Sequence, residues 1–254
     1  MNTKILYLGD TAINQAASYL AGIMAYFNIE FDYVPSDKKI PDNLLDKNYR
    51  AIIISDYPSR NFTSEQFEAI RQKVISGTGL MMIGGWESFV GIDGKYNKTI
   101  LADILPIKMQ DSDDRINCSQ PCLVEIISEH PIVAQLPFTE CPPGIGGYNL
   151  LQAKSNANVI LASRQFKVNV NDGKFRFMAE EQAQPLLIIG EYQNGRTLAF
   201  ASDVAPHWVG GLVDWGDKRI CACATKHGAE AIEVGNHYSQ LFVNMIKWVA
   251  KFNV

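Results

Sequence analysis

Short apolar segments that alternate with helical segments are the feature that most constrains this fold. Four such runs lie in the first third of the chain, at 4–8 (KILYL), 31–34 (FDYV), 51–55 (AIIIS) and 80–83 (LMMI). Each run is too short for a helix, and the third is almost wholly apolar, as strands buried on both faces are. The order strand, helix, strand, loop, strand, helix, strand predicts a parallel sheet with helices on both faces.

Two helical segments separate these strands. The first has apolar residues at helical spacing from Ile13 to Phe27, and Thr11 is its expected N-terminal cap. The second opens at Thr63 and Gln66, which have the spacing of a capping box, and ends before a glycine.

The second half of the chain predicts an antiparallel extension of the sheet. Two or three strands are expected within 150–170, and single strands are expected at 122–128, 185–189 and 196–202. The sequence Asn171-Asp172-Gly173 is a strong hairpin signal, Asp111–Arg115 is interpreted as a solvated turn, and an amphipathic helix ends the chain. Since no repeat or low-complexity linker interrupts the sequence, residues 1–254 are expected to form one α/β domain with a mostly parallel central sheet.

Composition excludes several classes of partner. The 254 residues carry a net charge of −4 without a cluster of Lys and Arg, which argues against nucleic acid and anionic membranes as partners. No run approaches the roughly 18 apolar residues that span a bilayer, and the N-terminus lacks a signal-type segment. The five scattered cysteines do not indicate a disulfide framework, so a cytoplasmic protein with free thiols is expected.

Polar residues follow the predicted strands at the positions where ligands bind in parallel sheets. Asp10, Asp56 and the segment Gly84–Ser88 all stand at carboxyl ends of strands. Because these ends meet at one edge of the sheet, a shared ligand-binding rim is expected there.

Three stretches combine polar groups with aromatic rings: Gly84–Phe89 (GGWESF), Ala201–Trp208 (ASDVAPHW), and Gly211–Trp215 (GLVDW) with His237-Tyr238. An indole beside a carboxylate and an imidazole supplies a platform, a general base and a proton shuttle, which suit a sugar or a small amide. The candidate catalytic residues are His207, Glu87 and Asp203. The candidate ligand-binding residues are Gly84, Gly85, Trp86, Ser88, Trp208 and Asp10. Alternatively, each of these residues only caps or holds its own turn.

Motifs for other chemistries are absent. No Gly-x-Ser-x-Gly elbow and no phosphate-binding glycine loop occurs, and no cysteine stands between a strand and a helix. Cys221 and Cys223 lie on one face of an expected strand near His227, but a metal site would need two further ligands. Small buried cysteines are the preferred interpretation, and neither a metal nor a cofactor is expected.

Several stretches resemble the class I glutamine amidotransferase-like superfamily, in particular its branch near the trehalose-utilisation-type proteins. They include LYLGDT, SGTGLMMIGGWESFVGIDGKY, HPIV, PLLIIGEYQNGRTLAFASDVAPHW and GNHYSQLFVNMIKWVA, and the resemblance covers nearly the whole chain. It implies a flavodoxin-like three-layer αβα sandwich. The superfamily's nucleophilic cysteine elbow has no counterpart here, and His207 matches its late histidine without the carboxylate two residues on. Gly84-Gly85 resembles its oxyanion-loop glycines, so the Gly85 amide is expected to anchor a carbonyl oxygen.

Three functions remain open from the sequence. The first is a protein that binds, and in the enzymatic case hydrolyses or isomerises, a small polar ligand, with Glu87 or His207 as acid/base. The second is a catalytically silent interaction or sensor module. The third is a glutaminase that uses Cys118 or Cys141. In addition, the aromatic segment Gly211–Trp215 is expected to be covered by a homo-oligomer contact or by a loop.

Overall fold

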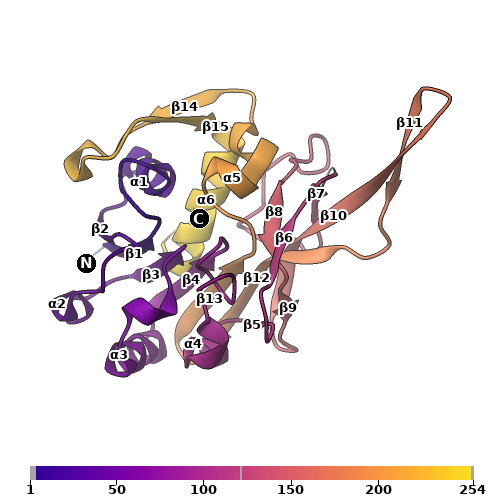
Figure 1. The fold of residues 1–254 in the computed structure, drawn as a ribbon. Helices are drawn as coiled ribbons and strands as arrows, with labels where there is room; N and C mark the ends of the chain where they lie inside the picture. The colour runs from indigo at the N-terminus through magenta and orange to yellow at the C-terminus, as the bar shows by residue number, and fades with distance from the viewer. Residues whose placement is uncertain (1–3, 121, 253–254) are drawn as a thin grey trace.

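The computed structural model describes residues 4–120 and 122–252, and its core is a mixed sheet between two groups of helices (Figure 1). The strands are β1 Ile5–Gly9, β2 Phe31–Val34, β3 Ala51–Ser55, β4 Gly79–Ile83, β5 Ile107–Lys108, β6 Arg115–Asn117, β7 Cys122–Ile126, β8 Gly147–Asn149, β9 Gln152–Ala153, β10 Asn158–Asn171, β11 Lys174–Ala179, β12 Gln184–Tyr192, β13 Gly195–Phe200, β14 Arg219–Ala222 and β15 Ile232–Gly235. The α-helices are α1 Ala17–Tyr26, α2 Asp42–Leu45, α3 Ser64–Ile75, α4 Leu101–Ile104, α5 Pro206–Val209 and α6 Asn236–Val249.

The main sheet has the strand order β11-β10-β12-β13-β4-β3-β1-β2, and β7 pairs with β10. The pairs among β13, β4, β3, β1 and β2 are parallel, whereas the pairs that β10 makes with β7, β11 and β12, and that β12 makes with β13, are antiparallel. The predicted parallel sheet with an antiparallel extension is therefore confirmed, and the arrangement is consistent with a flavodoxin-like fold.

The helices cover both faces because the chain moves outward from β1 in two directions. It passes from β1 to β2 through α1 and from β3 to β4 through α3, so right-handed crossovers place these helices on opposite faces. Helix α1 contacts α6, while α3 contacts α2 and α4 (Figure 1). The four strands β1, β3, β4 and β13 between the two layers are almost wholly buried, as their apolar sequences require.

One of three local predictions needs correction. Helix α1 begins at Ala17 and its N-cap is Ala16, so Thr11 does not cap it; residues 13–16 form a turn before the helix. The prediction of two or three strands within 150–170 is confirmed, because this segment contains the short β9 and the first 13 residues of β10. The register of β10 on β12 shifts near Leu161. The capping box at α3 is also confirmed, since Thr63 Oγ1 accepts from Gln66 N at 3.2 Å and Gln66 Oε1 accepts from Thr63 N at 3.0 Å.

No helix within residues 4–120 and 122–252 has the length and apolar character that a membrane crossing requires.

Candidate functional site

A pocket of about 500 Å³ lies at the carboxyl ends of the parallel strands, where the sequence predicts a ligand rim. Asp10 directly follows β1, Asp56 directly follows β3, and Asp203 lies three residues after β13. The pocket is lined by Asp10, Thr11, Ala16, Ser36, Asp56, Trp86, Glu87, Ile92, Asp93, Asp203, Ala205 and His207. The structure thus brings together six of the nine sequence candidates at the edge or on the wall of one cavity: Asp10, Trp86, Glu87, Asp203 and His207 line it, and Gly85 packs against its Asp56.

The backbone at two strand ends has a conformation that aspartate tolerates better than most residues. Asp10 and Asp56 have φ values of 41° and 44°, in the left-handed region. Gly85, with φ of 150°, lies so close to Asp56 that an added Cβ would stand 2.1 Å from Oδ1 of that carboxyl group. The double glycine therefore lets the loop after β4 come close to the end of β3.

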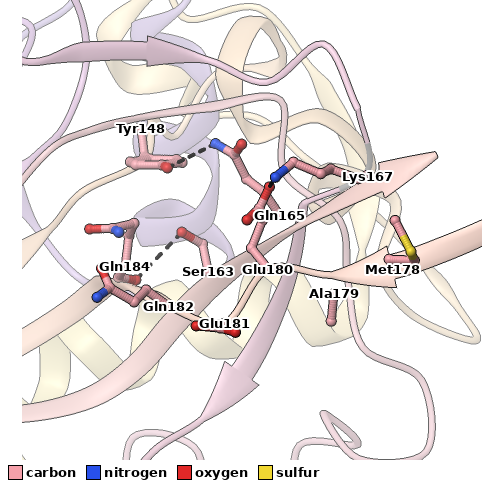
Figure 2. Close-up of a pocket in the computed structure, with 10 residues that line it drawn as sticks. All are labelled: Tyr148, Ser163, Gln165, Lys167, Met178, Ala179, Glu180, Glu181, Gln182 and Gln184. Carbon is pink, nitrogen blue, oxygen red and sulfur yellow. Dashed lines mark hydrogen bonds and ion pairs between the residues drawn. The ribbon is translucent and has the colours of Figure 1, made fainter. Parts of the chain in front are cut away.

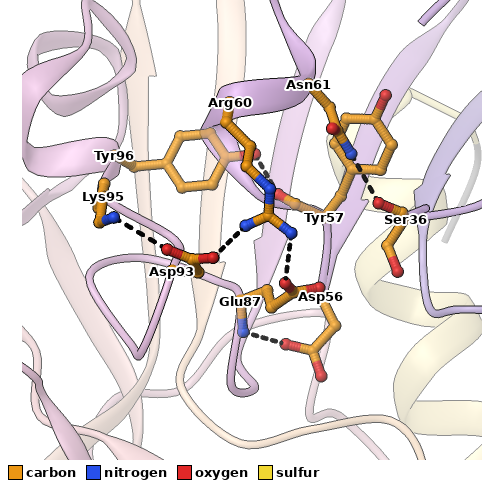
Figure 3. Close-up of polar contacts among 9 residues, drawn as sticks. All are labelled: Ser36, Asp56, Tyr57, Arg60, Asn61, Glu87, Asp93, Lys95 and Tyr96. Atoms are coloured by element: carbon orange, nitrogen blue, oxygen red, sulfur yellow. Dashed lines mark hydrogen bonds and ion pairs between the residues drawn. The ribbon is translucent and has the colours of Figure 1, made fainter. Parts of the chain in front are cut away.

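Asp56 is fixed by the loop that follows β4. Its Oδ1 accepts a hydrogen bond from Glu87 N at 2.7 Å (Figure 3), and its own N–H donates to Ser88 Oγ at 3.0 Å. The Ser88 side chain is buried. Ser88 consequently holds the backbone of Asp56 from the protein interior and does not line the pocket.

The other two carboxyl groups are held by their own strands. Tyr7 Oη donates to Asp10 Oδ2 at 2.6 Å, and Asp203 Oδ1 accepts from Val204 N at 2.6 Å and Ala205 N at 3.1 Å. Both aspartates are buried. These contacts fix the carboxyl groups on the floor of the cavity.

Burial raises the pKa values of all three aspartates, and the charges of neighbouring aspartates raise those of Asp56 and Asp203 further. Burial raises the pKa of Asp10 to about 6, and burial together with the charge of Asp10 raises the pKa of Asp203 to about 8. The pKa of Asp56 is also raised, by burial first and then by the charges of Asp203 and Asp10. No lysine or arginine is among the described residues that line the cavity, so no cation there opposes these upward shifts, and the interacting aspartates bind and release protons as a group.

Trp86 and His207 form an aromatic wall of the pocket. Their ring centroids are 5.5 Å apart at an interplanar angle of 71°, and the guanidinium of Arg115 lies 4.8 Å from the Trp86 ring centroid. Trp86 is 41% exposed, and the His207 imidazole makes no hydrogen bond to the described part of the protein. Both rings are therefore accessible to a molecule in the pocket.

Glu87 is occupied by an ion-pair network (Figure 3). Arg60 Nη2 contacts Glu87 Oε1 at 3.1 Å, and its Nη1 pairs with Asp93, which also contacts Lys95 Nζ at 2.9 Å. This network orders the rim, and it makes Glu87 less available as an acid/base than His207.

Three candidate residues, Gly84, Gly85 and Trp208, are engaged inside the protein and do not face a ligand. The Gly85 amide donates to Asn149 Oδ1 at 2.9 Å, and the Gly84 amide donates to Phe200 O at 2.7 Å and Ser202 O at 3.0 Å. The expectation that the Gly85 amide anchors a carbonyl oxygen of the ligand is therefore wrong, because this N–H already donates to Asn149. Trp208 is likewise buried, with its indole N–H bonded to Asn117 Oδ1 at 2.8 Å, and is not a ligand platform.

Sequence reasoning missed the buried pair that supports the rim loop. Asn149 Nδ2 donates to Asp114 Oδ1 at 2.7 Å and to Gly85 O at 3.2 Å, while Asp114 accepts from the amides of Val90 and Gly91. Asp114 is 2% exposed, so the interpretation of Asp111–Arg115 as a solvated turn is wrong at this residue. A run of acidic residues gives no local signal that one of them is turned inward.

Comparison with known proteins places the chain in a family. A family described as "putative glutamine amidotransferase" matches residues 7–220. The chain belongs to this GATase1-like family. No curated protein matches it.

Solved structures resemble this family member over almost its whole length. The cytoplasmic protein STM1381 of Salmonella typhimurium LT2 is 28% identical with a TM-score of 0.71, and the match covers 97% of this chain and 99% of the other. The cytoplasmic protein STM3548 of Salmonella typhimurium is also 28% identical, with a TM-score of 0.69 and coverage of 97% and 98%. A ThuA-like protein of Parabacteroides merdae shares the fold at 12% identity, a TM-score of 0.57 and coverage of 98% and 90%.

The cysteines of this GATase1-like chain lie away from the pocket. All five are free thiols, and none of them lines the cavity with His207. Cys221 is exposed and Cys223 is partly exposed, so the expectation that both are small buried cysteines is wrong. Within the part of the chain that the structure describes, no three His, Cys, Asp or Glu side chains group as metal ligands.

The segment Gly211–Trp215 is covered by a loop of the same chain. The Trp215 ring packs on Phe138 with centroids 4.5 Å apart, and its indole N–H donates to Cys141 O at 2.7 Å. Trp215 is buried, so of the two expected covers the loop is the one observed.

Proposed function

We propose that this protein binds a small polar ligand, a sugar or an amide, in the pocket at the carboxyl ends of β1, β3 and β13. The observation that carries the proposal is the cluster of Asp10, Asp56 and Asp203 beneath the accessible rings of Trp86 and His207. Carboxyl groups with shared protons both donate and accept hydrogen bonds, as the hydroxyl groups of a sugar require. The cavity volume also lies within the range of small-molecule sites.

The charge of the pocket selects against anions. Among the described residues that line it, five are Asp or Glu and one, His207, has a basic side chain. Glu87 and Asp93 are paired with Arg60 and Lys95, but no ion pair within the described residues compensates Asp10, Asp56 and Asp203. A phosphorylated or carboxylated ligand would meet these three carboxyl groups, which is unfavourable at short range. A neutral polyhydroxyl compound or amide would instead pack one face against Trp86 and place its polar groups on the aspartates.

The same residues provide a proton donor and acceptor in the enzymatic form of this proposal. The raised pKa of Asp203, about 8, keeps this carboxyl group protonated at neutral pH, where it can act as a general acid. The His207 imidazole makes no hydrogen bond to the residues that the structure describes, so its ring nitrogens are available to a bound ligand. Hydrolysis or isomerisation of a bound sugar or amide needs one group of each kind.

Glutamine hydrolysis through a thiol receives less support. A hydrogen bond with the Cys122 thiol lowers the pKa of Cys118, but Cys118 lies beside Gln165 and not on the pocket wall. Cys141 is exposed on a loop. A nucleophilic thiol needs an adjacent base, and neither cysteine shares the cavity with His207.

The location proposed for the protein is the cytoplasm. It rests on the two Salmonella proteins described as cytoplasmic and on the five free cysteines.

The proposal is tested by a thermal-shift screen against sugars, amino acids and small amides at pH 7, followed by calorimetric titration of any hit. A ligand that binds only the native state raises the melting temperature of the wild type. We expect Trp86→Ala and His207→Ala to weaken binding at least tenfold. His227→Ala, which alters an exposed histidine outside this pocket, is the matched control and should bind as the wild type does.

A hit that binds all four proteins equally would show that the pocket is not the site. No hit from any compound class would favour the interaction or sensor module, in which the Arg60 network and the bonds of Asp203 only stabilise loops. Release of ammonia from glutamine, abolished by iodoacetamide, would establish the glutaminase instead.

A further inference from the structure

The far half of β10 and the whole of β11 form a hairpin that projects from the body of the protein (Figure 1). This hairpin, residues 166–179, is called the arm here. Along this length its two strands pair with each other and with no other strand of the part of the chain that the structure describes, and every residue of β11 is exposed. The arm therefore has two solvent-accessible faces, unlike the rest of the sheet.

One face of the arm is wholly apolar. Its cross-strand pairs are Phe166 with Ala179, Val168 with Phe177, and Val170 with Phe175. Alternation along paired strands places these six side chains on the same face. Phe175 is 67% exposed, Phe177 61% and Val170 58%, whereas Phe166 and Val168 at the base are half-buried, so the outer part of the apolar face is uncovered in the single chain.

The opposite face of the arm is polar and basic. It carries Lys167, Asn169, Asn171, Lys174 and Arg176, together with the apolar Met178, and Lys167 Nζ contacts Glu180 Oε1 at 3.0 Å. At its base this face borders a second cavity of about 680 Å³ (Figure 2), in which Gln165 and Lys167 point toward polar neighbours. The contrast between the faces shows that the apolar side is specific and not a general property of the arm.

We propose that the apolar face of the arm packs against the same face of a second copy of this chain. A two-stranded hairpin is marginally stable alone in water, and an apolar face of this kind indicates a protein contact. The face is self-complementary, because two identical apolar surfaces related by a two-fold axis exclude water from each other. No other partner is needed to complete it.

The area of the apolar face fits a homodimer contact. Its six side chains offer roughly 400 Å² of accessible surface, so two arms would bury roughly 800 Å² of apolar area, and the polar rim would bring the total to the roughly 1,000 Å² of a specific interface. The basic residues also favour face-to-face packing of the two arms over pairing of their β11 edges. Pairing of two β11 edges would bring Lys174 and Arg176 of both copies together, whereas face-to-face packing keeps them on the outer sides.

The test compares two variants that add the same charge to adjacent residues on opposite faces of the arm. Val170→Asp places a carboxylate in the proposed contact, and Asn169→Asp places one on the polar face. Sedimentation velocity is measured for the full chain from 1 to 100 μM. We expect dimers of the wild type and of Asn169→Asp, and at least a tenfold increase in the dimer dissociation constant for Val170→Asp.

The double variant Phe175→Ser/Phe177→Ser gives a second readout and should be monomeric. Both altered residues are exposed, so circular dichroism and the melting temperature at low concentration should match those of the wild-type monomer. A wild type that is monomeric throughout, or a dimer that survives both Val170→Asp and the double variant, would overturn the proposal. An equal loss of dimer with Asn169→Asp would overturn the assignment to the apolar face.

Discussion

At the scale of single residues, Asn149 does more for the site than its position in the sequence suggests. Its side chain links both backbone groups of Gly85 to the buried carboxyl group of Asp114, so it joins β8 to the loop after β4. Asp114 in turn fixes the amides of Val90 and Gly91. The position of Trp86 and Glu87 at the pocket therefore depends on two residues that line no part of it.

Asn149→Ala should destabilise the protein by about 1–3 kcal/mol, because it leaves buried polar groups of Gly85 and Asp114 without a partner. Urea unfolding followed by circular dichroism measures the change. Asn156→Ala, at an exposed position, is the control and should alter the free energy of unfolding by less than about 0.5 kcal/mol. A similar small effect for both variants would show that the loop is held without the Asn149 amide.

At the scale of elements, the sequence predicts the N-terminal cap of α3, and the contribution of this cap to the free energy of unfolding can be measured. Thr63 and Gln66 form the predicted reciprocal bonds, and the Gln66 amide also donates to Asp42 Oδ1 at 2.7 Å, which ties α3 to α2. Thr63→Ala should cost about 1 kcal/mol, since it removes one partner of the first helical amides. Ser64→Ala, one residue further along, should be nearly neutral in the same unfolding experiment, and equal losses would contradict the capping role.

The elements that sequence predicted best are those whose signals are local. The strand ranges of β2 and β3 are as predicted, because short apolar runs bounded by polar residues report burial directly. The rim at Asp10 and Asp56 follows from the parallel order of these strands. In contrast, the inward turn of Asp114 depends on Asn149, 35 residues away, and the burial of Trp208 depends on Asn117. Such contacts leave no periodic signal in either segment.

At the scale of the whole molecule, three strands bring three carboxyl groups together. The protonation of these groups therefore affects the free energy of unfolding of the whole protein. The pKa of Asp203 is about 8 in the folded protein and the pKa of Asp10 is about 6, against an ordinary value of 3.8. Between pH 4 and pH 8 the folded chain holds protons that the unfolded chain has released. Stability due to these groups is therefore complete at low pH and is lost as the pH rises through the folded pKa values.

The free energy of unfolding of the wild type should thus contain a term that falls, on the order of a few kcal/mol, from about pH 5 to pH 8. Asp203→Asn removes a carboxyl group whose pKa is raised to about 8 in the folded protein, and an amide oxygen can still accept from Val204 N and Ala205 N. The variant should be more stable than the wild type at pH 8, and the difference should shrink toward pH 5. Asp46→Asn, at an exposed position, controls for the loss of one charge and should follow the wild-type profile. A constant difference between Asp203→Asn and the wild type at every pH would mean that Asp203 does not hold a proton in the folded protein, and the general-acid role proposed for it would fail with that result.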